Sequence, residues 1–295
     1  MPSTRDIRRR IKSVKNTAQI TKAMQMVAAS KMRRAQQAAL AGRPYADLMN
    51  SVLAGLVTDT KEFVHPLMEK REVRKRAIIL VSTDKGLCGS LNSNLLREAG
   101  RFPRDTTVYI AAGRKGSQFV ARAKRQLAAE FTYKDAPLFA EARAISKFAQ
   151  DLFLKGEVDE VIVLYTKFIS TLNQRPEARP LLPIGEIAPV TAGVGARAAA
   201  PAPATPEGPE IDFLFEPGQE QVIGALLPHS LNFQVFQILL EAKASEQSAR
   251  MVAMKNATDN AKQLVKDLTL EYNKMRQASI TKELLEITSA AMALG

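Results

Sequence analysis

The stretch LNFQVFQILLEAKASEQSARMVAMKNATDNAKQLVKDLTLEYNKMRQASITKELLEITSAAMAL, residues 231–294, contains neither glycine nor proline. These two residues interrupt helices most often, so their absence over 64 positions predicts one continuous helix. With a rise of about 1.5 Å per residue, such a helix is about 96 Å long. Its apolar and small residues recur at intervals of three and four, which is typical of a coiled-coil seam. They are Val235, Ile238, Leu239, Ala242, Ala249, Val252, Leu264, Leu268, Tyr272, Met275 and Ile287.

A second long helix is predicted at the other end of the chain. Residues 3–41 also lack glycine and proline, and Ser3 followed by Asp6 has the form of a capping box at a helix N-terminus. The segment Gly42-Arg43-Pro44 ends or bends this helix, which we expect to continue over residues 45–56. Its apolar and small residues follow the same spacing: Ile7, Ile11, Val14, Ala18, Thr21, Ala28, Met32, Ala35 and Ala39.

Neither helix can bury its own stripe, so we expect the two to pair as an antiparallel coiled coil. The small residues 28–30 fit opposite the similarly small stretch 244–249, and the numbers of paired positions then add to about 275. In this register the start of the chain lies beside Tyr272, and about twenty C-terminal residues are unpaired. That end is apolar, and a single apolar helix is marginal in water, so it needs a socket supplied by another molecule.

The middle of the chain alternates between strands and helices. Strands are predicted at 76–82, 106–113 and 160–168, and helices from about Ser90, over 114–127 and over 136–156. This alternation predicts a small open Rossmann-like α/β domain inserted between the two terminal helices.

The segments that we expect are an N-terminal helix (1–57), the α/β domain (58–190), a Pro/Ala-rich flexible insertion (191–210), and a C-terminal segment (211–295) with a short strand before the long helix. Gly224 and Pro228 predict a break or kink before Ser230. No run approaches the roughly 18 apolar residues that a membrane span needs.

Positive charge is concentrated at the N-terminus. The chain carries a net charge of +12, and residues 1–43 hold eleven Lys and Arg against the single acid Asp6. A basic helix of this kind indicates an acidic partner, which could be nucleic acid, an anionic membrane or an acidic protein surface; the alternative is a merely solvated face.

The residues for zinc or nucleophilic chemistry are scarce, since the chain has one cysteine, Cys88, and two histidines, His65 and His229. Gly86 and Gly89 lie between a strand and a helix, where they could form a phosphate-binding loop or simply a tight turn, but the stretch has neither a Walker nor a dinucleotide pattern. We therefore expect no cofactor.

Four separated stretches resemble the gamma subunit of the rotary F-type ATP synthase of bacteria. They are ITKAMQMVAASKMRRAQ, STDKGLCGSLN, ASEQSARMVAMKNATDNA and YNKMRQASITKELLEI, in this order along nearly the whole chain. The resemblance implies a non-catalytic central-stalk rotor that couples proton flow to ATP synthesis. It also implies one copy per complex, peripheral at the cytoplasmic face of the bacterial inner membrane. The partners implied are the hexamer of alpha and beta subunits, the epsilon subunit and the membrane c-ring, and no nucleic acid.

The resemblance also implies contact residues, carried over by motif. Arg276 and Gln277 are similar to the pair that grips a loop of a catalytic beta subunit, and Met24 with Lys22 and Lys31 is similar to a contact with acidic beta-subunit loops. The C-terminal tip in the hexamer sleeve would include Ile280, Thr281, Glu283, Glu286, Ile287 and Ala290, where Ala290 replaces the glycine of the family. The foot near the membrane ring would include Phe213, Leu214, Phe215 and Glu216.

Two other functions are compatible with the residues alone. A basic coiled coil could bind nucleic acid, although the helix from residue 231 onward is near charge balance. An α/β enzyme could instead use the loop at Gly86.

Overall fold

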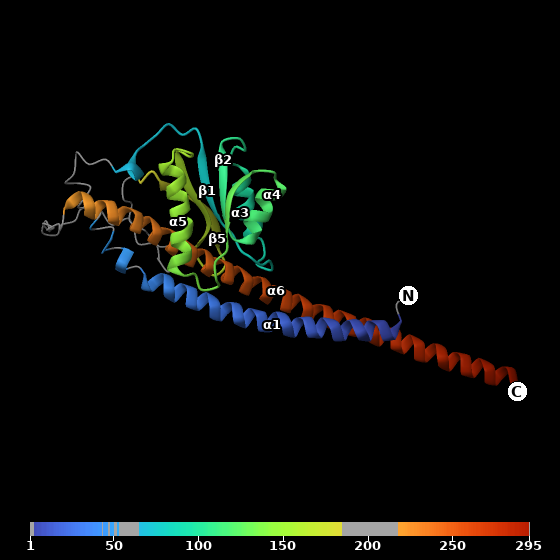
Figure 1. Ribbon diagram of the computed structural model, residues 1–295. Coiled ribbons are helices and arrows are strands. Elements are labelled where there is room, and N and C mark those ends of the chain that lie inside the picture. Colours follow the sequence, from blue (N-terminus) through green and yellow to red (C-terminus); the bar gives the residue numbers. More distant parts are fainter. Residues whose placement is uncertain are drawn as a thin grey trace. The chain divides into compact units, whose positions relative to one another are not determined.

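The structure, a computed structural model, describes residues 3–42, 44–46, 48, 49, 52, 65–184 and 218–294. The chain divides into two compact units, Met1–Ala28 with Arg250–Gly295, and Ala29–Ala249. The long helices α1 (Thr4–Ala41) and α6 (Gln219–Leu294) each contribute to both units (Figure 1). For this reason the units do not follow the predicted segments of the sequence. The insertion 191–210 lies outside the described residues.

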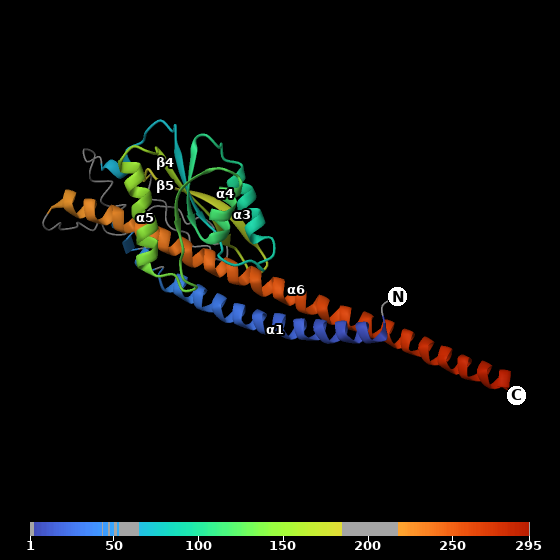
Figure 2. The same cartoon turned by 45° about the vertical axis from the view of Figure 1, so that its right-hand side comes forward.

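The first unit is a pair of helices. The Oγ1 atoms of Thr21 and Thr258 lie 2.7 Å apart, at hydrogen-bond distance, and their residue numbers add to 279. The two helices lie side by side (Figures 1 and 2). The same sum pairs their buried or half-buried side chains, which recur at alternating intervals of four and three. In α1 these are Ile7, Ile11, Val14, Ala18, Thr21, Gln25 and Ala28, and in α6 they are Tyr272, Leu268, Val265, Ala261, Thr258, Met254 and Met251. The predicted antiparallel coiled coil is confirmed.

The predicted register was wrong by about one helical turn, because the sum is 279 and not 275. A shift of one turn brings the apolar stripe back to nearly the same face, so the periodicity could not distinguish the two registers. By this sum Ser3 lies opposite Arg276 and not Tyr272. The predicted unpaired end is confirmed, since all described side chains from Arg276 to Met292 are exposed.

The N-terminus of α1 has the predicted capping box. The Ser3 hydroxyl donates to Asp6 Oδ2 at 2.8 Å, and the Asp6 amide donates to Ser3 Oγ at 3.3 Å. The bond from the Ser3 hydroxyl, and a second one of 3.3 Å from the Ser3 backbone amide to the same carboxylate oxygen, lower the pKa of the Asp6 carboxyl because they favour its charged form. The residues described between 44 and 52 are helical as well, which agrees with the predicted continuation of the first helix.

The second unit contains a five-stranded sheet in the order β3-β2-β1-β4-β5. Its strands are β1 (Arg76–Val81), β2 (Thr107–Ala112), β3 (Gln126–Phe131), β4 (Glu160–Phe168) and β5 (Gln174–Leu182). The first four strands are parallel, and β5 pairs antiparallel with β4. The predicted fold class, an α/β domain between two long helices, is confirmed.

Helices cover both faces of the sheet. On one face, Ile78 and Leu80 of β1 pack with residues of α3 (Leu91–Gly100) and α4 (Arg114–Arg122). On the other, Ile79 and Val81 pack in a core that includes residues of α5 (Phe139–Leu154), of α6 and of the short 3-10 helix η1 (Pro66–Met68) (Figure 2). The alternation along β1 follows from the period of two in a strand, and it explains why its sequence is apolar throughout.

The sequence did not predict two of the five strands. Residues 114–127 were expected to be one helix, but α4 ends at Arg122 and β3 begins at Gln126. The sequence of β3, QLAAEF, is rich in residues that favour helices, and its pairing with β2 overrides that preference. The strand β5 contains two prolines, which an edge strand tolerates because it has unpaired positions.

Of the break or kink predicted before Ser230, the break is absent, since α6 begins at Gln219 and includes Pro228. A proline inside a helix costs about 3 kcal/mol, and the buried side chains of Leu227, Leu231 and Val235 offset this cost in the second unit. Between residues 221 and 292, α6 contains a stretch that is long and apolar enough to cross a membrane. The apolar runs of the sequence did not predict this stretch. Half of it is buried inside the protein, as is usual for a helix in a core.

Candidate functional site

The C-terminal tip of α6, residues 276–292, exposes an apolar surface in the first unit. Its large apolar side chains are 49 to 85% exposed, although residues of this type are usually buried. They are Ile280, Leu284, Leu285, Ile287 and Met292. A single helix that presents so many apolar groups is typical of a surface that binds another protein.

The polar groups of the tip contact their own helix. The hydroxyls of Thr281 and Thr288 donate to the carbonyls of Gln277 and Leu284, and Lys282 lies 3.6 Å from Glu286 across one helical turn. These contacts stabilise the helix locally by a few tenths of a kcal/mol, and they leave its apolar side chains exposed. The residues predicted for the tip are therefore all on one exposed segment: Ile280, Thr281, Glu283, Glu286, Ile287 and Ala290.

Sequence reasoning assigned only part of this surface. Leu284 and Leu285 were not among the predicted site residues, although they are more than half exposed and belong to the same apolar run. The absence of a polar tail after residue 287 was the signal that could have included them. Arg276 and Gln277 lie where the paired part of the helices ends, and both are exposed.

The exposed surface of α1 in the first unit is strongly basic. The side chains of Arg5, Arg8, Arg9, Arg10, Lys12, Lys15 and Lys22 are all exposed. Met24, by contrast, is half-buried beside the seam position Gln25. A row of solvated cations on one helix attracts an acidic surface and strengthens an encounter at low ionic strength.

Lys31 does not share the setting of Lys22 and Met24. It belongs to the second unit, where its ammonium group binds the carboxylate of Asp135. The structure therefore brings Lys31 to an acid of its own chain, and it places Lys22 and Met24 in the other unit. The predicted foot residues, Phe213 to Glu216, lie outside the described residues.

Open α/β sheets commonly bind ligands at the carboxyl ends of their strands, and here α6 contacts the carboxyl end of β4. The carboxylate of Glu241 accepts a hydrogen bond of 3.2 Å from the amide of Phe168, at the end of β4. Ser248 donates to the carbonyl of Thr171 at 2.8 Å, just beyond that strand. Burial raises the pKa of Glu241 to about 6, because the charged form loses solvation.

The loop at Gly86 is held by hydrogen bonds among its own residues and the first turn of α3. The hydroxyl of Thr83 donates to the carbonyl of Lys85 at 2.8 Å, and the amide of Asn92 donates to Thr83 Oγ1 at 2.7 Å and to Cys88 Sγ at 3.3 Å. Two surface cavities, one beside Phe102 and one beside Phe148, are lined by other residues. Within the described residues, no group of His, Cys, Asp and Glu could hold a metal ion. The loop thus has the contacts of a tight turn between β1 and α3.

Comparisons with known proteins agree along the whole chain. A family model described as ATP synthase matches residues 3–294. The chain is 51% identical to the ATP synthase gamma chain of Opitutus terrae over 99% of both chains. It is 49% identical to that of Roseiflexus castenholzii, over 100% of this chain and 99% of the relative.

Solved structures show the same fold. The central stalk and c-ring of the Tetrahymena thermophila mitochondrial ATP synthase includes a chain with a TM-score of 0.61 and 27% identity; the match covers 81% of this chain and 99% of that one. A chain in the rotor of the Euglena gracilis mitochondrial ATP synthase has a TM-score of 0.65 and 20% identity, with 94% and 98% covered.

Proposed function

Because this chain belongs to the ATP synthase gamma chain family, we propose that it is the central-stalk rotor of a proton-translocating ATP synthase. It transmits torque between a membrane ring driven by protons and a catalytic hexamer of alpha and beta subunits, and it carries out no chemistry of its own. As a peripheral subunit at the cytoplasmic face of the bacterial inner membrane, it is present in one copy per complex. Its further partners are the epsilon subunit and the c-ring.

One observation carries this proposal: the apolar tip of α6 extends past the end of its partner helix and is exposed. A ring of alpha and beta subunits with an apolar sleeve would supply the socket that the tip lacks. The basic surface of α1 would face acidic loops of the beta subunits, with Lys22 and Met24 at that contact. Exposed ion pairs contribute about 1 kcal/mol or less each, so they can form and break as the shaft turns.

Arg276 and Gln277 are proposed to grip a loop of one beta subunit at a time. They lie on the exposed surface where the pairing of the helices ends, so they can reach a partner outside the chain. Different contacts with each beta subunit would shift that subunit between its open and closed states, which is coupling by differential binding. The foot, Phe213 to Glu216, is proposed to contact the c-ring.

A deletion of Ile280–Gly295 tests the proposal. We expect the shortened chain to retain the α/β domain and the helix pair, because the deleted described side chains are exposed. In the complete ATP synthase reconstituted into vesicles, we expect weaker assembly and weaker proton pumping driven by ATP. A shortened chain that assembles and pumps at the rate of the full chain would argue against the socket. A chain that loses its global fold would contradict the structural premise.

The other two functions are not retained. The comparisons lend no support to nucleic-acid binding, and the basic charge has a protein partner in the rotor proposal. The hydrogen bonds of Thr83 with Lys85 and Asn92 hold the loop at Gly86, and α6 contacts the carboxyl end of β4, at the end of the strands where α/β enzymes bind substrates.

A further inference from the structure

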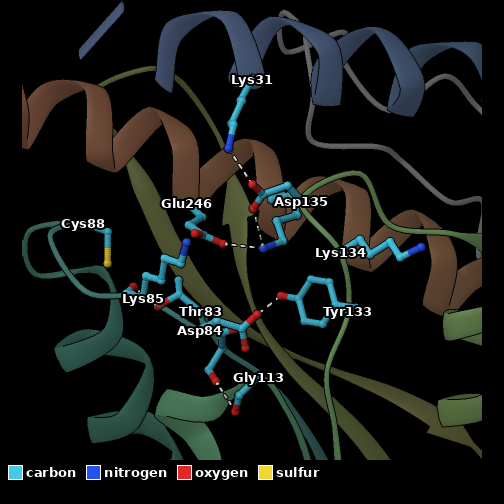
Figure 3. Close-up of polar contacts among 12 residues, drawn as sticks. Lys31, Thr83, Asp84, Lys85, Cys88, Gly113, Tyr133, Lys134, Asp135 and Glu246 are labelled. Carbon is cyan, nitrogen blue, oxygen red and sulfur yellow. Dashed lines mark hydrogen bonds and ion pairs between the residues drawn. The ribbon is translucent and has the colours of Figure 1, made fainter. Parts of the chain in front are cut away.

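A single carboxylate of the second unit binds a lysine from each long helix. Asp135 lies in the connection between β3 and α5. Its Oδ2 atom accepts a hydrogen bond from Lys31 of α1 (Figure 3). Its Oδ1 atom lies 3.7 Å from the Nζ atom of Lys243 of α6. One side chain of the α/β domain is therefore joined to both helices.

Lys243 is a buried charge with several partners. Its side chain is 3% exposed, and it forms an ion pair of 3.0 Å with Glu246, whose side chain is 5% exposed. Its Nζ atom also lies 4.7 Å from the centre of the Tyr133 ring, in a cation–π contact. A charge buried to this degree persists only when it is paired, so the cluster resists rearrangement.

The cluster continues to the central strand of the sheet. The hydroxyl of Tyr133 donates to the carbonyl of Ser82 at 3.0 Å, just after the end of β1. Ser82 is buried, and its hydroxyl accepts a hydrogen bond of 2.7 Å from the amide of Gly116 in α4. The contacts thus run without interruption from β1 through Tyr133, Lys243 and Asp135 to Lys31.

Asp135 is held in its charged form. The hydrogen bond from Lys31 is the largest cause that lowers the pKa of this carboxyl, and the charges of Lys243 and Lys85 act in the same direction. The contacts of Asp135 with both helices are therefore present throughout the neutral pH range.

We propose that Asp135, together with Lys31 and Lys243, forms the junction through which torque passes between the α/β domain and the two long helices. Apolar packing between a helix and a sheet resists separation, but it is non-directional. Charge-assisted hydrogen bonds are directional and short, so they resist a tangential force. This inference rests on the proposed rotor function and specifies where in the chain the load is carried.

The test uses the complete ATP synthase reconstituted with the full chain, carrying Asp135→Asn. This variant keeps the size of the side chain and removes its charge. Two rates are compared: ATP hydrolysis with the proton gradient collapsed, and ATP-driven proton pumping against a gradient. We expect hydrolysis without load to stay within about twofold, and pumping under load to fall by about threefold or more, because only the loaded junction needs directional bonds.

Two further variants distinguish a role of the cluster in bearing the load from a role in stability alone. Asp135→Glu keeps the charge, and we expect it to recover most of the pumping under load. Glu98→Gln breaks the exposed pair with Arg101 in the same domain, 2.9 Å in length, and touches neither long helix. We expect it to leave both rates unchanged. If Asp135→Asn prevents assembly, Tyr133→Phe removes only the hydrogen bond to Ser82, and we expect a smaller loss confined to the loaded rate.

The outcomes are distinct. Pumping at the wild-type rate under load in Asp135→Asn, or in Tyr133→Phe where that variant is needed, would overturn the junction. An equal loss of loaded and unloaded rates would also overturn it, because the cluster would then serve stability alone. A wild-type complex that hydrolyses ATP but cannot pump protons would instead refute the rotor function, and so the two failures can be told apart.

Discussion

Helix α6 has opposite surroundings in its two parts. Every residue from 237 to 248 is buried, whereas every described side chain from 276 to 292 is exposed. The buried part includes the ionisable residues Glu241, Lys243 and Glu246, and the exposed part includes Ile280 and Leu285, which is the reverse of the usual distribution. Burial along this helix is therefore decided by the partners available and not by hydropathy. The charges of the first part have partners within the chain, and the apolar groups of the second are exposed.

The position at which α6 becomes exposed depends on the register of the helix pair. A pair of introduced cysteines tests this register, because a disulfide forms only between positions that lie side by side. The Oγ1 atoms of Thr21 and Thr258 are 2.7 Å apart, so their Cβ atoms are near the separation that a disulfide needs. We expect Thr21→Cys with Thr258→Cys to form an internal disulfide upon oxidation, seen as a shift in non-reducing electrophoresis. Thr21→Cys with Met254→Cys, one turn away, is the control for a sum of 275. A higher yield of disulfide from this control would contradict the sum of 279, and the exposed tip would then begin about one helical turn earlier in α6.

Two leucines of α6 allow a direct comparison of the buried part of the helix with its exposed part. Leu239 is fully buried in the core of the second unit, and Leu285 is 63% exposed. We expect Leu239→Ala to lower the free energy of unfolding by about 2–5 kcal/mol, because it leaves a cavity. The same change at Leu285 is expected to stay within about 0.5 kcal/mol. Urea denaturation of both variants checks this contrast. Equal losses would show that the tip is buried in the isolated chain.

The sequence was sufficient for the features that depend on local chemistry. The absence of glycine and proline predicted both long helices, and the Ser3–Asp6 pair predicted the start of the first. Periodicity predicted which faces pair, but it could not choose between registers one turn apart. The strands β1, β2 and β4 were predicted from apolar runs, because parallel strands in a covered sheet are buried on both faces.

Features that depend on distant contacts could not be predicted. The strand β3 is stabilised by pairing with β2 against its own propensity, and Pro228 is accommodated by the packing of α6. Asp135 follows no motif, and nothing in the sequence indicates that it meets Lys31 and Lys243, which are more than a hundred positions away on either side. Lys31 was assigned by resemblance to an external contact, and its partner inside the chain became apparent only from the fold.

The buried part of α6 should show a pH dependence of stability that originates in the burial of Glu241. The pKa of Glu241 is raised from 4.5 to about 6 by burial, so the folded state binds a proton more tightly than the unfolded state. The contribution of this group to stability is therefore greatest below pH 4.5 and is lost as the pH rises through 6. We expect Glu241→Gln to relieve a cost of about 2 kcal/mol at pH 7.5 but only about 1 kcal/mol at pH 5.

Chemical denaturation of the wild type and Glu241→Gln at both pH values measures this difference. Glu286→Gln in the exposed tip is the matched control, and we expect it to change the free energy of unfolding by no more than about 0.5 kcal/mol, because the side chain is exposed. A Glu241→Gln effect that does not depend on pH would mean that the carboxylate is well solvated in the folded protein.

The smallest expected effect concerns the helix of the tip itself. Ala290 is exposed, so Ala290→Gly removes no packing and changes mainly helix propensity, by up to about 1 kcal/mol. We expect the amides of the last turns to exchange hydrogen up to about fivefold faster, as measured by mass spectrometry. Gly224→Ala, near the start of α6, should slow the exchange of nearby amides, because alanine favours the helix and its added Cβ meets no atom within 4 Å. Unchanged exchange at the tip of Ala290→Gly would show that these turns are already frayed in the free chain.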